Sequence, residues 1–93
     1  MIRSFGSSDT ERIWHEQYVK GIDRKLQRAT LRKLEMLHAA KVLEDLLIPP
    51  GNRLERLVGD RRGQHSIRVN AQWRICFVWR DGGAEYVELV DYH

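Results

Sequence analysis

The sequence predicts an α+β domain in which two helices pack on one face of a small antiparallel sheet. Apolar residues recur at helical spacing between residues 9 and 40, and they alternate with polar residues from residue 53 onwards. Turn signals separate the alternating segments. Helices that precede a run of hairpin-connected strands are typical of a fold with all helices on one side of the sheet.

The length and composition suit a single globular domain over residues 1–93. The hydrophobic content of 42% and charged content of 31% are ordinary for such a domain. No apolar run approaches the ~18 to 20 residues that cross a bilayer, and the start of the chain lacks a signal-peptide core. We therefore expect a cytoplasmic protein with no membrane partner.

The N-terminal quarter predicts a short strand over residues 2–5 and then a helix. The capping-box signature Ser8-Asp9-Thr10-Glu11 places the start of this helix at about Asp9, and Gly21 is a natural stop. The expected apolar side of this helix comprises Ile13, Trp14 and Tyr18.

A second helix is predicted from the N-cap Asp23 through Ala40. Its apolar stripe has helical spacing and comprises Leu26, Ala29, Leu34, Leu37 and Ala40. The arginines elsewhere on its circumference favour a solvated surface over a nucleic-acid contact. A short helical turn over residues 42–48 should end at Pro49-Pro50-Gly51.

From Arg53 the apolar period changes from 3.6 to 2, which predicts three or four antiparallel strands. Leu54 and Val58 bracket the first of these strands, and Ile67 and Val69 are the apolar residues of the second. The third is expected over residues 73–80, and the last runs from Glu85 to about Tyr92. The turns between them are Gly59 to Gly63, Ala71-Gln72 and the strong hairpin signal Asp81-Gly82.

Strand alternation predicts which polar residues a ligand could reach. Arg68, Arg74 and one of Asp91 or Tyr92 should share the face that the helices leave uncovered. Cys76, in an apolar run, reads as a core thiol. The sequence predicts neither a cofactor nor a metal site, because no metal-ligand spacing relates the histidines His15, His38, His65 and His93.

Residues 53–80 carry a dense and one-sided charge. Seven arginines and two acids give this stretch a charge of +5, in a chain of net charge +3. A guanidinium presents a planar fork of donors that fits a phosphate bidentately, so the preference for arginine indicates a polyanionic partner. Solvated arginines on a small sheet are the alternative.

The residues Asp91-Tyr92-His93 offer a proton acceptor, a hydroxyl and a group that titrates near neutrality. Together with Pro50 to Glu55, Gly59-Asp60-Arg61 and Trp73-Arg74-Ile75, they resemble in order and spacing a HigB-type toxin of the RelE/ParE superfamily. Members are toxins of bacterial toxin-antitoxin pairs, also called plasmid maintenance killer proteins. The resemblance covers residues 2–93 and implies a RelE-like fold.

The resemblance implies a type II toxin that is a metal-free, ribosome-dependent mRNA endonuclease, or mRNA interferase, and inhibits translation. The family's active-site positions correspond here to Arg74, Asp91, Tyr92 and His93. RNA can be cut by its own 2′-hydroxyl once that group is deprotonated and the leaving oxygen protonated. Arg74 would stabilise the phosphate charge, and His93 would be the general acid or base. Asp91 would be a base or orient His93, and Tyr92 would donate to the phosphate or stack on a base.

The implied partners are mRNA on the ribosome, ribosomal RNA and a HigA-like helix-turn-helix antitoxin. The arginines expected to contact RNA phosphates are Arg53, Arg56, Arg61, Arg62 and Arg68. Two positions depart from the family, because some members have His at Glu55 and many have Lys at Val58. Glu55 could serve as the base or be an exposed structural residue. Two alternatives stay open: a ParE-like DNA gyrase inhibitor, and a catalytically decayed module that binds antitoxin or RNA.

Overall fold

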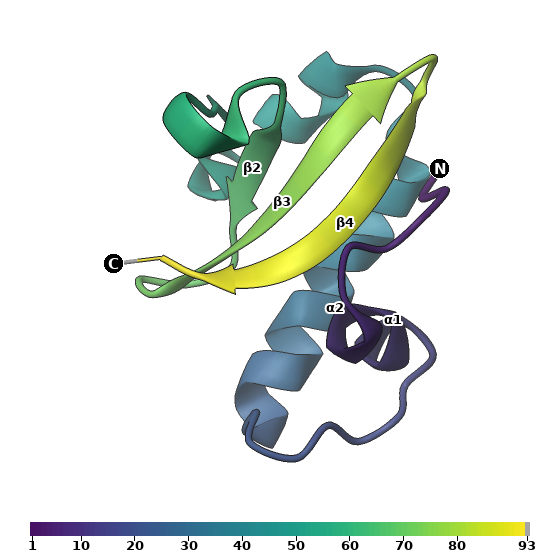
Figure 1. Cartoon of the computed structure of the whole chain (residues 1–93), viewed down its shortest axis with the longest axis vertical. Helices are drawn as coiled ribbons and strands as arrows, with labels where there is room; N and C mark the ends of the chain where they lie inside the picture. Colours follow the sequence, from purple (N-terminus) through teal and green to yellow (C-terminus); the bar gives the residue numbers. More distant parts are fainter. Residues whose placement is uncertain (93) are drawn as a thin grey trace.

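Two helices and a four-stranded antiparallel sheet make up the fold, as the sequence predicts. The computed structural model describes residues 1–92 (Figure 1). The strands lie in the order β1-β2-β3-β4, and both helices lie on one side of the sheet (Figure 1). The elements are α1 (Ser8–Trp14), α2 (Arg24–Ala39), β1 (Glu55–Arg56), β2 (His65–Arg68), β3 (Trp73–Arg80) and β4 (Gly83–Asp91), with 3-10 turns η1 (Leu43–Leu47), η2 (Pro50–Asn52) and η3 (Gly59–Arg61).

Helix α2 forms where its capping residue and apolar stripe predict it. The Asp23 side chain accepts a hydrogen bond from the Leu26 N–H at 2.9 Å, which satisfies a free donor of the first turn. Leu34 and Leu37 are fully buried against the sheet. Ala40 ends the helix in an extended conformation.

Helix α1 is shorter than predicted. Its N-cap is Ser7, whose hydroxyl accepts from the Thr10 N–H at 3.2 Å, and it ends at Trp14. Glu16 then adopts the left-handed region with a φ of 59°, which a helix does not allow. Tyr18 therefore lies outside the helix with 63% of its surface exposed, so its predicted place on the apolar side is wrong. Val19 is buried instead.

The N-terminal segment does not form a full strand but covers the outer edge of β4. Two isolated parallel bridges join Ile2 to Ala84 and Phe5 to Val87, so the predicted strand over residues 2–5 exists only as these bridges. The segment runs beside β4 in Figure 1. Gly6 allows this close approach, because a Cβ there would lie 2.9 Å from the Tyr86 carbonyl oxygen. The covered edge is one that could otherwise pair with another chain.

Strand β1 has only two residues, and the predicted apolar role of Val58 is wrong. Val58 is 81% exposed, and the neighbouring Leu57 is buried instead. Gly59, with a φ of 67°, begins the turn η3 directly after Val58. Glu55 pairs with Ser66 of β2, and Arg56 pairs with His65.

The predicted hairpin between β3 and β4 is confirmed. Asp81 and Gly82 both have positive φ, 51° and 75°, as a type I′ turn requires. A bulge follows, because Cys76 pairs with Glu88 but Val78 pairs with Glu85. The extra residue is taken up at Tyr86, whose φ is 54°.

This bulge sets which side chains of β4 face the helices. Past it, Val87 lies buried on the helix side and Glu88 lies on the opposite side. The core between sheet and helices includes Ile13, Leu34, Leu37, Ile67, Ile75, Phe77 and Val87. Within residues 1–92, neither helix has the length and hydropathy of a membrane span.

Candidate functional site

The candidate site lies on the sheet face away from the helices, here called the open face. One cross-strand row on it comprises Glu55, Ser66, Cys76 and Glu88, and the next comprises Arg68, Arg74 and Val90. The centre of this face is covered rather than solvated, since Ser66 and Cys76 are fully buried. Burial raises the pKa of the Cys76 thiol, as expected for a core residue.

Arg74 lies on the open face as predicted, but most of its guanidinium is already bound. Its Nε donates to the Ser66 hydroxyl at 2.7 Å, and its Nη2 donates to the Arg53 carbonyl at 2.6 Å. Only 8% of the residue is exposed. Within residues 1–92 its Nη1 has no hydrogen-bond partner and is not fully buried. Nη1 is therefore the donor that a ligand could contact.

The loop at Asn52 and Arg53, which Arg74 holds through the Arg53 carbonyl, is also held by hydrogen bonds of its own. Arg53 has a φ of 45°, a left-handed conformation. The preceding Asn52 is fully buried and donates to the carbonyls of Leu46 and Ile48. Lys33 of α2 donates to the Asn52 side-chain oxygen at 2.6 Å. Partial burial lowers the pKa of Lys33. The sequence analysis includes Asn52 in a motif but does not predict its burial, because nothing local distinguishes a buried Asn from a turn Asn.

Glu55 lies close to Arg74 on the open face. Its carboxylate is 4.0 Å from Arg74 Nη2, and its side chain is 56% exposed. A pair this exposed contributes little to stability. The geometry nevertheless leaves the Glu55 carboxylate accessible beside the guanidinium.

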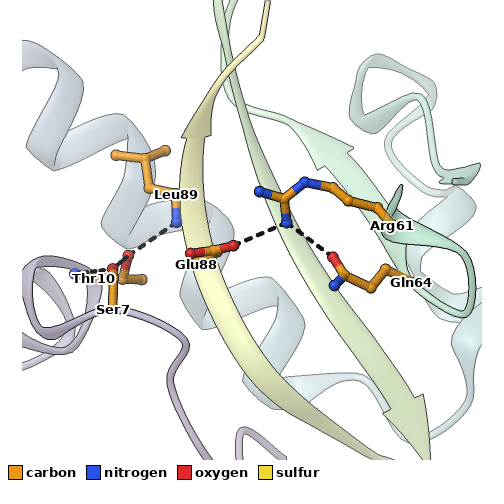
Figure 2. A network of polar contacts seen from close by, with 6 residues as sticks. All are labelled: Ser7, Thr10, Arg61, Gln64, Glu88 and Leu89. Carbon is orange, nitrogen blue, oxygen red and sulfur yellow. Dashed lines mark hydrogen bonds and ion pairs between the residues drawn. The ribbon is translucent and has the colours of Figure 1, made fainter. Parts of the chain in front are cut away.

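Arg61 of η3 reaches across the open face to β4. Its Nη1 donates to Glu88 Oε1 at 2.9 Å and to Gln64 Oε1 at 3.1 Å (Figure 2). The Glu88 hydrogen bond raises the pKa of Arg61, so this guanidinium stays charged. The side chains of Arg61 and Glu88 are 32% and 28% exposed.

The structure divides the last predicted site residues between the two faces. Asp91 pairs with Trp73 and therefore shares the helix-side face with Leu89, opposite to Arg74. Its carboxylate accepts from Gln72 Nε2 at 3.1 Å. Tyr92 directly follows the end of β4, and continued alternation from Val90 would place it on the open face. It also contributes to the raised pKa of Arg61. His93 lies outside the described residues.

The five arginines predicted to bind RNA do not form one surface. Arg53 and Arg62 are exposed, and Arg68 is half-buried with its Nε bound to the Asn70 carbonyl. Arg56 pairs with His65 and so points to the side away from Arg74. Among residues 1–92, no three His, Cys, Asp or Glu side chains are grouped to hold a metal ion.

Solved structures share this fold. The YoeB-YefM complex from Staphylococcus aureus matches with a TM-score of 0.63 and 16% sequence identity, covering 100% of this chain and 98% of the other. A heterotetrameric YoeB-YefM toxin-antitoxin complex from the same organism matches with a TM-score of 0.62 and 16% identity, over the same shares of both chains. At this identity the likeness concerns the fold.

Curated relatives are closer in sequence. Toxin HigB-1 of Vibrio cholerae serotype O1 is 47% identical over 77 aligned positions, in an alignment that covers 76% of this chain and 81% of that protein. Endoribonuclease HigB of Proteus vulgaris is 30% identical over 97 aligned positions that cover 100% of both chains. The family described as the RelE-like toxin of type II toxin-antitoxin system HigB matches residues 3–93. The chain therefore belongs to the HigB-like family of RelE-like toxins of type II toxin-antitoxin systems.

Proposed function

We propose that this toxin is an endoribonuclease that cuts mRNA on the ribosome, in the cytoplasm, and thereby stops translation. The relative from Proteus vulgaris that it matches over its whole length is named Endoribonuclease HigB. The proposed reaction is attack of an RNA 2′-hydroxyl on the neighbouring phosphate, which the residues of the open face assist. Cleavage requires removal of the 2′-hydroxyl proton and donation of a proton to the leaving oxygen.

The observation that carries this proposal is the fixed position of Arg74. Two short hydrogen bonds, at 2.7 and 2.6 Å, hold its Nε and Nη2, so its Nη1 is oriented before any ligand arrives. A donor that is already oriented stabilises developing negative charge without reorganisation, and one such donor contributes about 3 kcal/mol to a transition state. The phosphate would lie on the open face, between Arg74 and Tyr92.

We assign the remaining roles from the chemistry of each side chain and, for the described residues, from the side of the sheet on which each lies. Tyr92, on the same face as Arg74, donates to the phosphate or stacks on a base. Asp91 faces the other side and already binds Gln72, so we assign it the orientation of His93 rather than contact with the phosphate. His93 is the proposed general acid or base, because an imidazole is the side chain that ordinarily titrates nearest to neutrality. Glu55, exposed beside Arg74, is the second candidate base.

The proposed partners are RNA and an antitoxin. Arg53, Arg62 and Arg68 offer charge for ribosomal RNA and mRNA phosphates near the open face, whereas Arg56 would meet RNA only from the other side. The S. aureus structures that share the fold are toxin-antitoxin complexes. We propose that a helix-turn-helix antitoxin, as the family implies, restrains this toxin.

Primer extension on mRNA tests this function. A translating extract receives a brief pulse of the wild-type protein or of a variant that lacks His93, at equal protein levels. We expect cuts within translated frames that vanish in the variant. A parallel reaction on the same mRNA without ribosomes should show no cuts.

Two other outcomes would support the two alternative functions. Intact mRNA, together with stalled supercoiling when the protein is added to DNA gyrase, would make the protein a gyrase inhibitor. Intact mRNA and normal growth on expression without antitoxin, with a folded protein by circular dichroism, would make it a catalytically decayed binding module.

A further inference from the structure

Arg61 differs from the other exposed or half-exposed arginines of this region because two side chains hold it. Glu88 of β4 and Gln64 after η3 both accept from the same nitrogen, Nη1 (Figure 2). The cross-sheet pair joins residues 27 positions apart in the chain. An arginine side chain loses much rotational freedom in such an arrangement.

Holding the guanidinium by Nη1 leaves its other edge available. Within residues 1–92, Nε and Nη2 of Arg61 form no hydrogen bond. In Figure 2 this edge faces the carboxyl end of β4, away from Gln64. Tyr92 follows that end, and it is near enough to Arg61 to help raise its pKa. Two parallel donors on one edge fit two oxygens of a phosphate.

We propose that the Nε and Nη2 edge of Arg61 binds a phosphate group of RNA, and that Glu88 and Gln64 are positioning residues that orient this edge. The inference rests on the proposed function for its ligand, a single-stranded RNA. The bound phosphate lies toward Tyr92, so the Arg61 site and Arg74 Nη1 line the same open face. Arg61 then contacts the substrate, and Glu88 acts on it only through Arg61.

The proposal reverses the ordinary electrostatic expectation for Glu88. Removing an acid from a surface that binds RNA raises the net charge from +3 to +4 and should strengthen binding. If Glu88 orients Arg61, its removal weakens binding instead, because the free side chain must be ordered again by the phosphate. Glu88→Gln keeps an acceptor oxygen for Nη1 and should behave much like the wild type.

The chain offers a matched control in a second Arg-Glu pair. Arg80 Nη1 of β3 lies 3.4 Å from Glu85 Oε1 of β4. Glu85 is on the same strand and the same sheet face as Glu88, but at the hairpin end. Glu85→Ala changes the net charge as Glu88→Ala does. It leaves Arg61 undisturbed, so charge effects appear in both variants and the positioning effect in only one.

The first test is a nitrogen-15 NMR titration of the arginine Nε–H groups in the purified protein with inorganic pyrophosphate. The Arg61 resonance is the one absent from Arg61→Lys, and the Arg80 resonance is the one absent from Arg80→Lys. We expect the Arg61 signal to move at a lower pyrophosphate concentration than the Arg80 signal, and to lose that advantage in Glu88→Ala. An Arg61 signal that moves no more than that of Arg80 would overturn the proposal.

The second test measures the initial rate of mRNA cutting in the translating extract. We expect Glu88→Ala and Arg61→Lys to lower it about 3- to 10-fold at subsaturating mRNA, with Glu88→Gln and Glu85→Ala near the wild type. Cutting by Glu88→Ala that equals or exceeds the wild type would refute the positioning role while leaving the nuclease intact. If the wild type cuts no mRNA but its Arg61 signal responds to pyrophosphate, the nuclease proposal fails and the phosphate site stands.

Discussion

Arg74→Ala is the obvious substitution to test catalysis, yet the structure predicts that it also destabilises the fold. It removes two short hydrogen bonds from a charged group, Nε to Ser66 Oγ at 2.7 Å and Nη2 to the Arg53 carbonyl at 2.6 Å. Bonds of this kind contribute about 1.5 to 3 kcal/mol each. The weaker contact to the Ser66 carbonyl, at 3.4 Å, and the exposed Glu55 carboxylate add little.

The expected loss in the free energy of unfolding is therefore about 3 to 6 kcal/mol, out of about 5 to 15 for a typical domain. Urea denaturation followed by tryptophan fluorescence measures it, and Tm should fall by at least about 12 °C. Arg80→Ala is the control, because Arg80 is 62% exposed at its side chain and should cost under about 1 kcal/mol. A cost below about 1 kcal/mol for Arg74→Ala would refute the anchoring role. Loss of toxicity would then report on the chemistry alone.

Three further substitutions test the packing around the site. Thr30→Val should stabilise the protein by about 1 kcal/mol in thermal melts, since the buried Thr30 hydroxyl has no hydrogen-bond partner among residues 1–92; lower stability would contradict this. Thr10→Val should lower the free energy of unfolding by about 1 to 3 kcal/mol, because the Thr10 hydroxyl accepts from the Leu89 N–H at 2.9 Å (Figure 2). An unchanged midpoint of urea denaturation would contradict a stabilising role of this hydrogen bond. Burial, and then the charge of Arg56, lowers the pKa of His65 in the folded protein, so the unfolded chain binds the extra proton. Stability should therefore fall as the pH drops below about 6.5, less steeply in His65→Gln, and equal slopes would count against the role of His65.

Helix α2 could be predicted almost to the residue because its signals are local. The Asp23 side chain meets the Leu26 N–H only three residues away, and the leucine stripe repeats at helical spacing. The Asp81-Gly82 turn is predictable for the same reason, since its conformation depends on its own two residues.

The elements that differ from prediction depend on distant contacts. Nothing near Tyr18 in the sequence indicates that Glu16 adopts a left-handed conformation and ends the helix early. The bulge at Tyr86 is likewise invisible to strand alternation, although Ser4 stabilises it by accepting from the Tyr86 N–H at 2.9 Å. Such pairings join opposite ends of the chain, and a local pattern contains no information about them.

For the candidate site, strand alternation predicted which sheet face the arginines share, but not which residues contact them. Arg68 and Arg74 share the open face as expected, and Asp91 lies on the opposite face, which leaves Tyr92 as the terminal candidate for the open face. The burial of Arg74 was not predictable, because Ser66 reads as a solvated strand residue and yet accepts its Nε. The pairing of Arg61 with Glu88 depends on how η3 lies over the sheet, which only the tertiary structure reveals.

The pairing of residues 2–5 with β4 has a consequence for how the toxin is made. Ser4 and Tyr86 are 82 positions apart, so a nascent chain carries the first segment long before its partner strand has been synthesised. Helix α2 can form during translation from local contacts, whereas contacts of such long range form late. Glu88 and Tyr92 also belong to this last part of the chain. A prematurely terminated product would therefore lack both the covered sheet edge and these candidate site residues, and we expect it to be an inert and poorly folded fragment.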